Sequence, residues 1–277
     1  MSARNKRRRW IMGLSTILGL KQKGFFLPYR YACSVQPIAY PALEPYFSAA
    51  KPDFTHLIRK IEALSSDIMA LSGKAAGARF DQAWFPGLDA LAAYAIIRDR
   101  QPRRIVEIGS GHSTRFMAAA IQDGGLSTGL VCIDPAPRAS LDHLDVQWRP
   151  SILQEAPADD IEALDEGDLL FVDSSHLLMP GTDVDYLIGH ILPRLRSGVY
   201  LHVHDIFLPD PYPSDWAWRG YNEQSAMAAL LQGNGYDLVF ASHYAATRMA
   251  SQLKNTPFRE ADVASTALQS SLWLQKR

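Results

Sequence analysis

The chain has 277 residues, of which 47% are hydrophobic, with 28 basic residues against 29 acidic ones and only two cysteines. This apolar content can bury the core of one large domain or two modest ones, and it excludes disordered, collagen-like and coiled-coil proteins. No apolar run approaches the roughly 20 residues that cross a bilayer. Two cysteines cannot form a disulfide framework, so we expect a cytoplasmic protein.

The charge is distributed unevenly along the chain. Residues 1–40 contain eight Lys or Arg residues and no acid, which leaves 20 basic and 29 acidic residues in the remainder. A basic segment of this kind can contact an anionic surface, whereas an acidic body repels a polyanion. We therefore expect no nucleic-acid partner, and peripheral membrane contact through the basic N-terminus is one expectation.

The first 20 residues share features with a secretory signal, because a basic stretch precedes the apolar residues 10–14. However, two more basic residues follow at Lys21 and Lys23, and an aromatic stretch comes next where a cleavage site would need small residues. We instead predict a short amphipathic helix that packs on the body, on a partner subunit or on a membrane surface. The oligomeric state, including a homo-oligomer, and the role of residues 1–32 stay open.

Two helices are predicted before the main fold. The four prolines of residues 33–52 predict an extended connector. Apolar residues at helical spacing then predict a helix that begins with Asp53 as its N-cap and ends at residues 73–77. A second helix is predicted over residues 88–98.

From residue 104 onwards, short apolar strands alternate with helices, which is typical of βαβ units and a parallel sheet. The predicted strands cover residues 105–108, 130–134, 146–148, 169–173, 199–203, 236–241 and 271–274, and the predicted helices cover residues 113–121, 158–164, 183–195 and 223–231. The chain ends with two strands and no crossover helix between them, so this final pair is predicted to be antiparallel. The pattern predicts an α/β fold.

A glycine-containing turn, Gly109-Ser110-Gly111, follows the first predicted strand. In open α/β sheets ligands bind at the carboxyl ends of the strands, where glycines let the backbone approach the ligand and the helix starting near Ser113 offers free N–H groups. Glu107 and Asp134 end the first two strands, and carboxylates suit a cationic amine and ribose hydroxyls. Thr114 stands where a dinucleotide-binding motif would have its third glycine.

Four motifs together are similar to the ordered motifs of class I S-adenosylmethionine-dependent methyltransferases: residues 104–114, 132–135, 170–176 and 203–205. The resemblance covers about residues 85–277, which we assign as the methyltransferase domain after a basic N-terminal segment and helical cap over residues 1–84. It implies a Rossmann-like, seven-stranded, mostly parallel sheet with an antiparallel last strand, plus an N-terminal helical extension. It also implies S-adenosylmethionine as cofactor, bound by Glu107, Gly109, Ser110, Gly111, Ser113 and Asp134, with Asp134 holding the ribose.

The candidate chemical site lies at the ends of the fourth and fifth predicted strands. Asp173, His204 and Asp205 converge there as oxygen and nitrogen ligands, which predicts a divalent cation, Mg²⁺ or another, that lowers the pKa of a substrate hydroxyl. His176 is predicted to remove the proton, so Asp173 and His176 are the expected catalytic residues.

The Asp-x-x-His spacing of Asp173 and His176 resembles the metal-dependent sugar O-methyltransferases that act on macrolide antibiotics. In that family an acidic pair helps to hold magnesium, but here His204-Asp205 takes its place. This departure leaves open whether a metal is required and which one.

Residues 208–221 form a long segment rich in aromatic residues and proline, directly after the candidate ligands. Loops of this length inside a compact domain are usually functional. The expected substrate-binding residues are Tyr212, Trp216, Trp218 and Arg219, the last for an anionic group of the acceptor.

The sequence therefore predicts methyl transfer from S-adenosylmethionine to a hydroxyl of a small molecule or saccharide. Three alternatives stay open: an NAD-linked oxidoreductase, a metal-dependent hydrolase built on His202, His204 and Asp205, and a non-catalytic binding protein on the same scaffold. The hydrolase cluster is complete only if the strand ends before Asp205, because alternation along a strand sends Asp205 to the opposite face from the two histidines.

Overall fold

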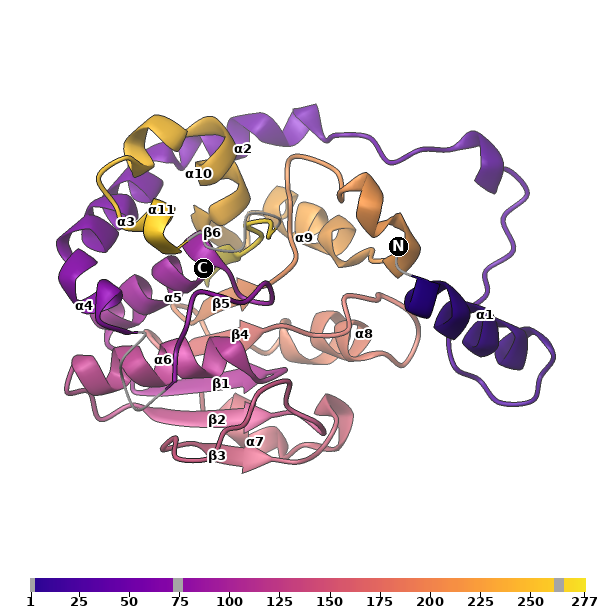
Figure 1. Cartoon of the computed structure of the whole chain (residues 1–277), viewed down its shortest axis with the longest axis horizontal. Helices are drawn as coiled ribbons and strands as arrows, with labels where there is room; N and C mark the ends of the chain where they lie inside the picture. The colour runs from indigo at the N-terminus through magenta and orange to yellow at the C-terminus, as the bar shows by residue number, and fades with distance from the viewer. Residues whose placement is uncertain (1–2, 72–76, 262–266) are drawn as a thin grey trace.

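A computed structural model describes residues 3–71, 77–261 and 267–277, and it is built around one central sheet (Figure 1). The sheet has seven strands in the order β3-β2-β1-β4-β5-β7-β6. Their bounds are β1 Arg104–Ile108, β2 Gly129–Ile133, β3 Gln147–Arg149, β4 Leu169–Val172, β5 Tyr200–Val203, β6 Tyr236–Ala241 and β7 Leu272–Lys276. The first five strands pair in parallel, and β7 runs antiparallel to both β5 and β6. The predicted Rossmann-like sheet with its antiparallel last strand is thus confirmed.

Helices surround the sheet. The α-helices are α1 Ala3–Ile17, α2 Glu44–Ala49, α3 Lys51–Ala63, α4 Ser65–Met69, α5 Gly87–Arg100, α6 His112–Asp123, α7 Ala158–Glu162, α8 Asp183–Tyr186, α9 Glu223–Gln232, α10 Ser242–Arg248 and α11 Phe258–Ala261. Shorter helical turns are η1 Ala32–Ser34, η2 Pro41–Leu43, η4 Leu153–Glu155, η5 Leu187–Ile191, η6 Ser214–Arg219 and η7 Ala250–Leu253. Within the described residues, no helix combines the length and apolar character needed to cross a bilayer.

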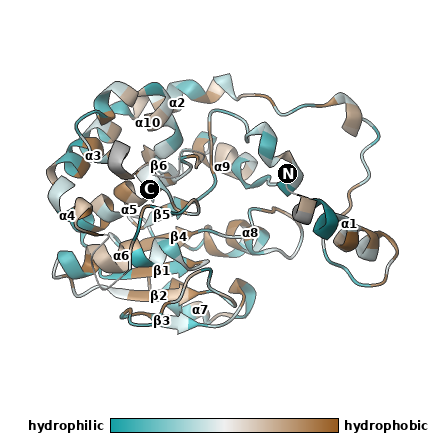
Figure 2. Ribbon diagram, viewed as in Figure 1, coloured by the Kyte–Doolittle hydropathy of each residue, from teal (hydrophilic) through white to brown (hydrophobic). Residues whose placement is uncertain are grey.

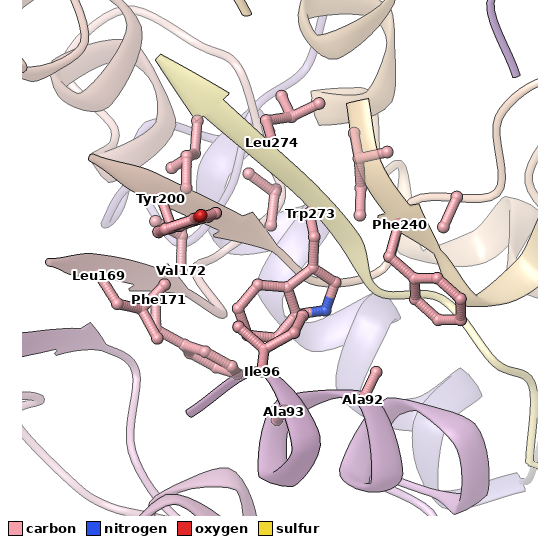
Figure 3. Close-up of a cluster of buried hydrophobic side chains, with 14 of the residues drawn as sticks. Ala92, Ala93, Ile96, Leu169, Phe171, Val172, Tyr200, Phe240, Trp273 and Leu274 are labelled. Atoms are coloured by element: carbon pink, nitrogen blue, oxygen red, sulfur yellow. The ribbon is translucent and has the colours of Figure 1, made fainter. Parts of the chain in front are cut away.

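The core lies where helix α5 packs against strands β4, β5 and β7 (Figure 3). Trp273 of β7 is fully buried at its centre, 6.0 Å from the ring of Phe171. Helix α5 supplies Ala92, Ala93 and Ile96 to the same cluster. Because residues on every side of α5 are buried, this helix runs through the interior rather than along the surface.

The helical region before the sheet differs from its prediction in three places. The predicted connector contains η2 and α2, whose Phe47 is buried. Helix α3 begins at Lys51 rather than after Asp53, because Pro52 fits the first turn, where its missing N–H has no partner to lose. It ends at Ala63, near which the Ser65 hydroxyl bonds a carbonyl of the preceding turn. Of the predicted helix end at 73–77, residues 73–76 lie outside the described part.

The predicted helix over residues 183–195 is also replaced by shorter pieces. Helix α8 covers four residues and continues as the π-helical turn η5. Its start is fixed by Thr182, whose hydroxyl accepts a hydrogen bond from the Asp185 N–H as a helix N-cap.

The domain boundary placed between residues 84 and 85 stays a prediction.

Candidate functional site

The turn after β1 packs directly against the loop after β4. Gly109 has φ +81, and a Cβ built on it would lie 1.9 Å from the carbonyl oxygen of Asp173. Only glycine fits a position that combines this left-handed backbone with so close an approach. The turn therefore lies directly against the backbone of Asp173, which places the predicted cofactor site beside the predicted chemical site.

Asp134, directly after β2, ties this turn to its neighbour. Its half-buried carboxylate accepts hydrogen bonds from the N–H groups of Ser110, at 2.6 Å, and Ala136, at 2.7 Å. Each carboxylate oxygen can accept a further bond, so a ribose hydroxyl can still be held there. The hydroxyl of Ser110 is buried and has no hydrogen-bond partner in the part of the chain that the structure describes. These polar groups fit a nucleoside ligand at the turn.

Glu107 lies beneath the turn, fully buried. Its two oxygens accept hydrogen bonds from the hydroxyls of Ser113 and Thr114, each at 2.5 Å. Burial raises the pKa of Glu107 to about 7. Glu107 and Ser113 thus brace the start of α6, and their contact with a cofactor stays a prediction.

Six side chains at the ends of β4 and β5 and on two helices form a network that we call the acid–histidine cluster: Asp89, Asp173, His176, His204, Asp205 and Glu223. His176 joins three of its carboxylates. Its Nδ1 lies 2.9 Å from Glu223, and its Nε2 lies 3.2 Å from both Asp173 and Asp205. The predicted residues Asp173, His176 and Asp205 are therefore brought together.

His204 occupies the other half of the cluster. Its Nε2 lies 3.3 Å from Asp89 of α5, and its Nδ1 lies 3.4 Å from Asp205 and 3.7 Å from Asp173. Asp89 in turn accepts hydrogen bonds from the backbone N–H groups of Ser270 and Ser271, just before β7. The cluster thereby links a core helix to three strand ends.

The charges within the cluster stabilise one another. Burial alone lowers the pKa of His176, but Asp205, Asp173 and Glu223 together raise it well above its ordinary value. His204 behaves in the same way. Burial raises the pKa of Asp173, yet its bonds to the two histidines hold that pKa well below its usual range. The surrounding carboxylates therefore favour the protonated form of both imidazoles.

His176 and Asp205 both have backbone angles in the left-handed region, with φ +61 and φ +58. Such angles are uncommon for non-glycine residues and concentrate at functional sites. Strand β5 ends at Val203, so the alternation of faces stops there, and Asp205 turns toward His204. His202 is instead a core residue, with its Nε2 2.9 Å from the Ser271 hydroxyl.

The residues predicted to hold a divalent cation do not fit one in this arrangement. Asp173 and Asp205 both face His176 Nε2, so an imidazole N–H takes the place between them that an ion would need. Over residues 3–71, 77–261 and 267–277, no group of three or more His, Cys, Asp or Glu side chains could hold a metal ion.

Asp89 and Glu223 were missed by the sequence analysis. Asp89 is a single acid inside the otherwise apolar stretch 88–97, and an unpaired charge there was the one available signal. Glu223 begins α9, 47 residues after His176, and it resembles any acid in the first turn of a helix. Both side chains are fully buried.

The aromatic segment lies against the cluster through Tyr221, whose ring centre is 4.6 Å from that of His176. The Arg219 guanidinium lies 4.0 Å from the Trp216 ring centre, 5.7 Å from that of Trp218, and bonds the Tyr221 hydroxyl. The hydroxyl of Tyr212 accepts a bond from the N–H of Gln224, beside Glu223. The four predicted substrate residues are thus gathered in one loop beside the cluster, and their contact with a substrate stays a prediction.

Residues 106–206 match the family model described as a methyltransferase domain. This range includes the glycine turn, Asp134, Asp173, His176 and Asp205, so it agrees with the resemblance found in the motifs. No curated protein sequence matches the chain.

Solved structures similar to the chain include the SAH-bound methyltransferase PaMTH1 of Podospora anserina, at 16% identity over 92% of this chain and 99% of that chain, with a TM-score of 0.41. Another is the O-methyltransferase TomG of Streptomyces achromogenes in complex with SAM, at 17% identity over 66% of this chain and 77% of that chain, with a TM-score of 0.37. Both are too distant to indicate a ligand of this chain.

Proposed function

We propose that this chain, whose residues 106–206 match a methyltransferase domain, transfers a methyl group from S-adenosylmethionine to a hydroxyl oxygen of a small molecule or saccharide. The observation that carries the proposal is the close approach of the glycine turn to the backbone of Asp173. It would bring a nucleoside held at the turn next to the acid–histidine cluster. The methyltransferase match favours this function over an NAD-linked oxidoreductase or a hydrolase.

Asp134 would hold the ribose hydroxyls, and the free hydroxyl of Ser110 would supply a further polar contact. When bound, the donor supplies an electrophilic methyl group on a sulfonium. Because carboxylates outnumber imidazoles in the cluster, its field favours a positive charge nearby. The protein mainly needs to align the acceptor and receive its proton.

Within the cluster, Asp173 and Asp205 are the members positioned to meet the acceptor. Their side chains are 17% and 10% exposed, whereas that of His176 is 2% exposed. Three carboxylates surround His176 and raise its pKa, so we propose a positioning role for it instead of the role as base that the sequence predicted. We assign His176 as the residue that positions Asp173 and Asp205. Asp205 accepts the hydrogen bond of the acceptor hydroxyl and takes its proton as the oxygen bonds to the methyl group and the carbon–sulfur bond breaks.

We also propose a cytoplasmic location, which fits the two free cysteines.

Replacing Asp134 with Asn should weaken the binding of S-adenosylhomocysteine about tenfold to a hundredfold, because a charge-assisted bond to the ribose is lost. The matched control is Asp142→Asn, an exposed acid of the following loop, which should leave the affinity unchanged. Calorimetry with the purified chain measures both. Binding of NAD in place of S-adenosylhomocysteine, or equal affinities for the two variants, would contradict the assigned pocket. Binding without transfer to any hydroxylated acceptor would instead favour the non-catalytic alternative.

A further inference from the structure

The N-terminal arm, residues 3–39, stands apart from the body (Figure 1). None of its residues whose side chains the structure describes is buried. The chain joins the body at Tyr40, whose N–H donates to the carbonyl of Pro209 at 2.7 Å. An arm without buried residues gains little from the domain it is attached to, so it is free to contact something else.

Helix α1 and the residue after it present an unpartnered apolar face. Five large side chains at spacings i, i+1, i+4, i+7 and i+8 lie on one side of the helix, each between 48% and 70% exposed: Trp10, Ile11, Leu14, Ile17 and Leu18. Figure 2 shows both hydrophilic and hydrophobic colours along this helix.

The covered side of α1 is the more polar one. The Ser15 hydroxyl donates to the carbonyl of Lys21, and the N–H of Lys23 donates to the Thr16 hydroxyl, so the chain folds back over that side. A helix of a soluble domain usually covers its apolar face and exposes only its polar face. In α1 the basic residues 6–9 are exposed, as usual, but the apolar face is exposed as well, which indicates that this face has a partner elsewhere.

The charge and the composition of the arm identify the kind of partner. Residues 1–40 carry eight basic residues and no acid, so the partner is anionic as well as apolar. Aromatic residues, which favour the boundary between lipid and water, are also exposed along the arm at Phe25, Phe26, Tyr29 and Tyr31. An anionic lipid surface combines all these properties.

A second copy of the chain is the competing partner, because its body is acidic. However, 13 of the 19 exposed large hydrophobic residues in the described part belong to the arm itself. The body therefore offers negative charge but few apolar side chains to receive the Trp10 face. We propose that the arm docks on a membrane surface rich in anionic lipids, with α1 lying in the headgroup region and its apolar face inward.

The test is sedimentation of the full chain with vesicles of phosphatidylcholine alone or mixed with phosphatidylglycerol. Binding should be at least about tenfold stronger to the mixed vesicles and should weaken with salt. Leu14→Gln should reduce it about tenfold, whereas the matched change Met12→Gln, on the covered side, should have little effect. Both variants should melt like the parent chain, since neither side chain is buried.

Three results would overturn the proposal. The first is equal binding to both kinds of vesicle, and the second is an equal loss in the Leu14 and Met12 variants. The third is a lipid-free dimer, measured by analytical ultracentrifugation, that Leu14→Gln dissociates, because the arm would then bind a second copy of the chain.

Discussion

Replacing His176 with Ala is expected to destabilise the fold by about 3 to 5 kcal/mol at neutral pH. The imidazole lies between Asp173, Asp205 and Glu223, and it is the proton carrier that all three share. Without it, three carboxylates lie in a buried space with no shared cation. Each must then either stay charged without a partner, at a cost in folding free energy, or take up a proton. Urea unfolding at pH 7 measures the loss.

The same substitution should change how stability depends on pH. In the parent chain the pKa values of His176 and His204 are raised, so their contribution is fully present below about pH 6.5 and is lost as the pH rises through the folded values. Each histidine gives a slope of at most about 1.4 kcal/mol per pH unit in that window. His176→Ala removes one such slope.

In the variant the freed carboxylates gain raised pKa values, so its stability should increase as the pH falls from 7 toward their unfolded values near about 4. The control is His190→Ala, which removes an exposed histidine that stacks on Tyr186 and should cost less than about 0.5 kcal/mol. Parallel pH profiles for the parent chain and His176→Ala would show that the cluster does not hold the charges described here.

The sequence predicted the part of the site that strand order determines. Because β1, β2, β4 and β5 are parallel neighbours, the residues at their ends had to meet at one edge, and Asp134, Asp173, His204 and Asp205 do lie there. These positions follow from apolar strand patterns and from the direction of each strand, which are both local properties of the sequence.

The remainder of the cluster depends on packing that no local pattern encodes. Asp89 reaches it because α5 crosses the core, and Glu223 reaches it because α9 begins beside the loop after β4. Packing also explains why the His176 ring, rather than the predicted cation, lies between Asp173 and Asp205. Spacing alone predicted converging ligands, but it could not show that a left-handed backbone at His176 turns the ring between the two aspartates.

The N-terminal helices show the same limit from another direction. Apolar spacing correctly located the buried face of α3, with Phe54, Leu57, Ile58 and Ile61 inside. Its start depended instead on Pro52, whose fixed φ suits a first helical turn, so a residue interpreted as part of a connector became part of the helix. Boundaries of this kind are decided by single residues rather than by the periodicity of the segment.

Gly109→Ala should destabilise the fold more than a Gly→Ala change at any other described glycine. We expect the free energy of unfolding to fall by more than about 4 kcal/mol, or the variant to fail to fold. The new Cβ would sit 1.9 Å from the carbonyl oxygen of Asp173, and the backbone fixes the position of both atoms, so no side-chain rotation relieves the contact. The left-handed φ of +81 adds a further penalty of about 1 to 2 kcal/mol.

The matched control separates these two contributions. Gly125 follows α6 with φ +58, and a Cβ there meets nothing within 4 Å. Gly125→Ala should therefore cost only the conformational penalty, about 1 to 2 kcal/mol. Thermal unfolding of both variants gives the difference in stability. Any folded Gly109→Ala protein should also bind S-adenosylhomocysteine more weakly, because the turn can accommodate the methyl group only by moving away from Asp173. Equal losses in the two variants would mean that the turn and the loop after β4 are not held together, and the proposed proximity of methyl donor and acid–histidine cluster would fail with them.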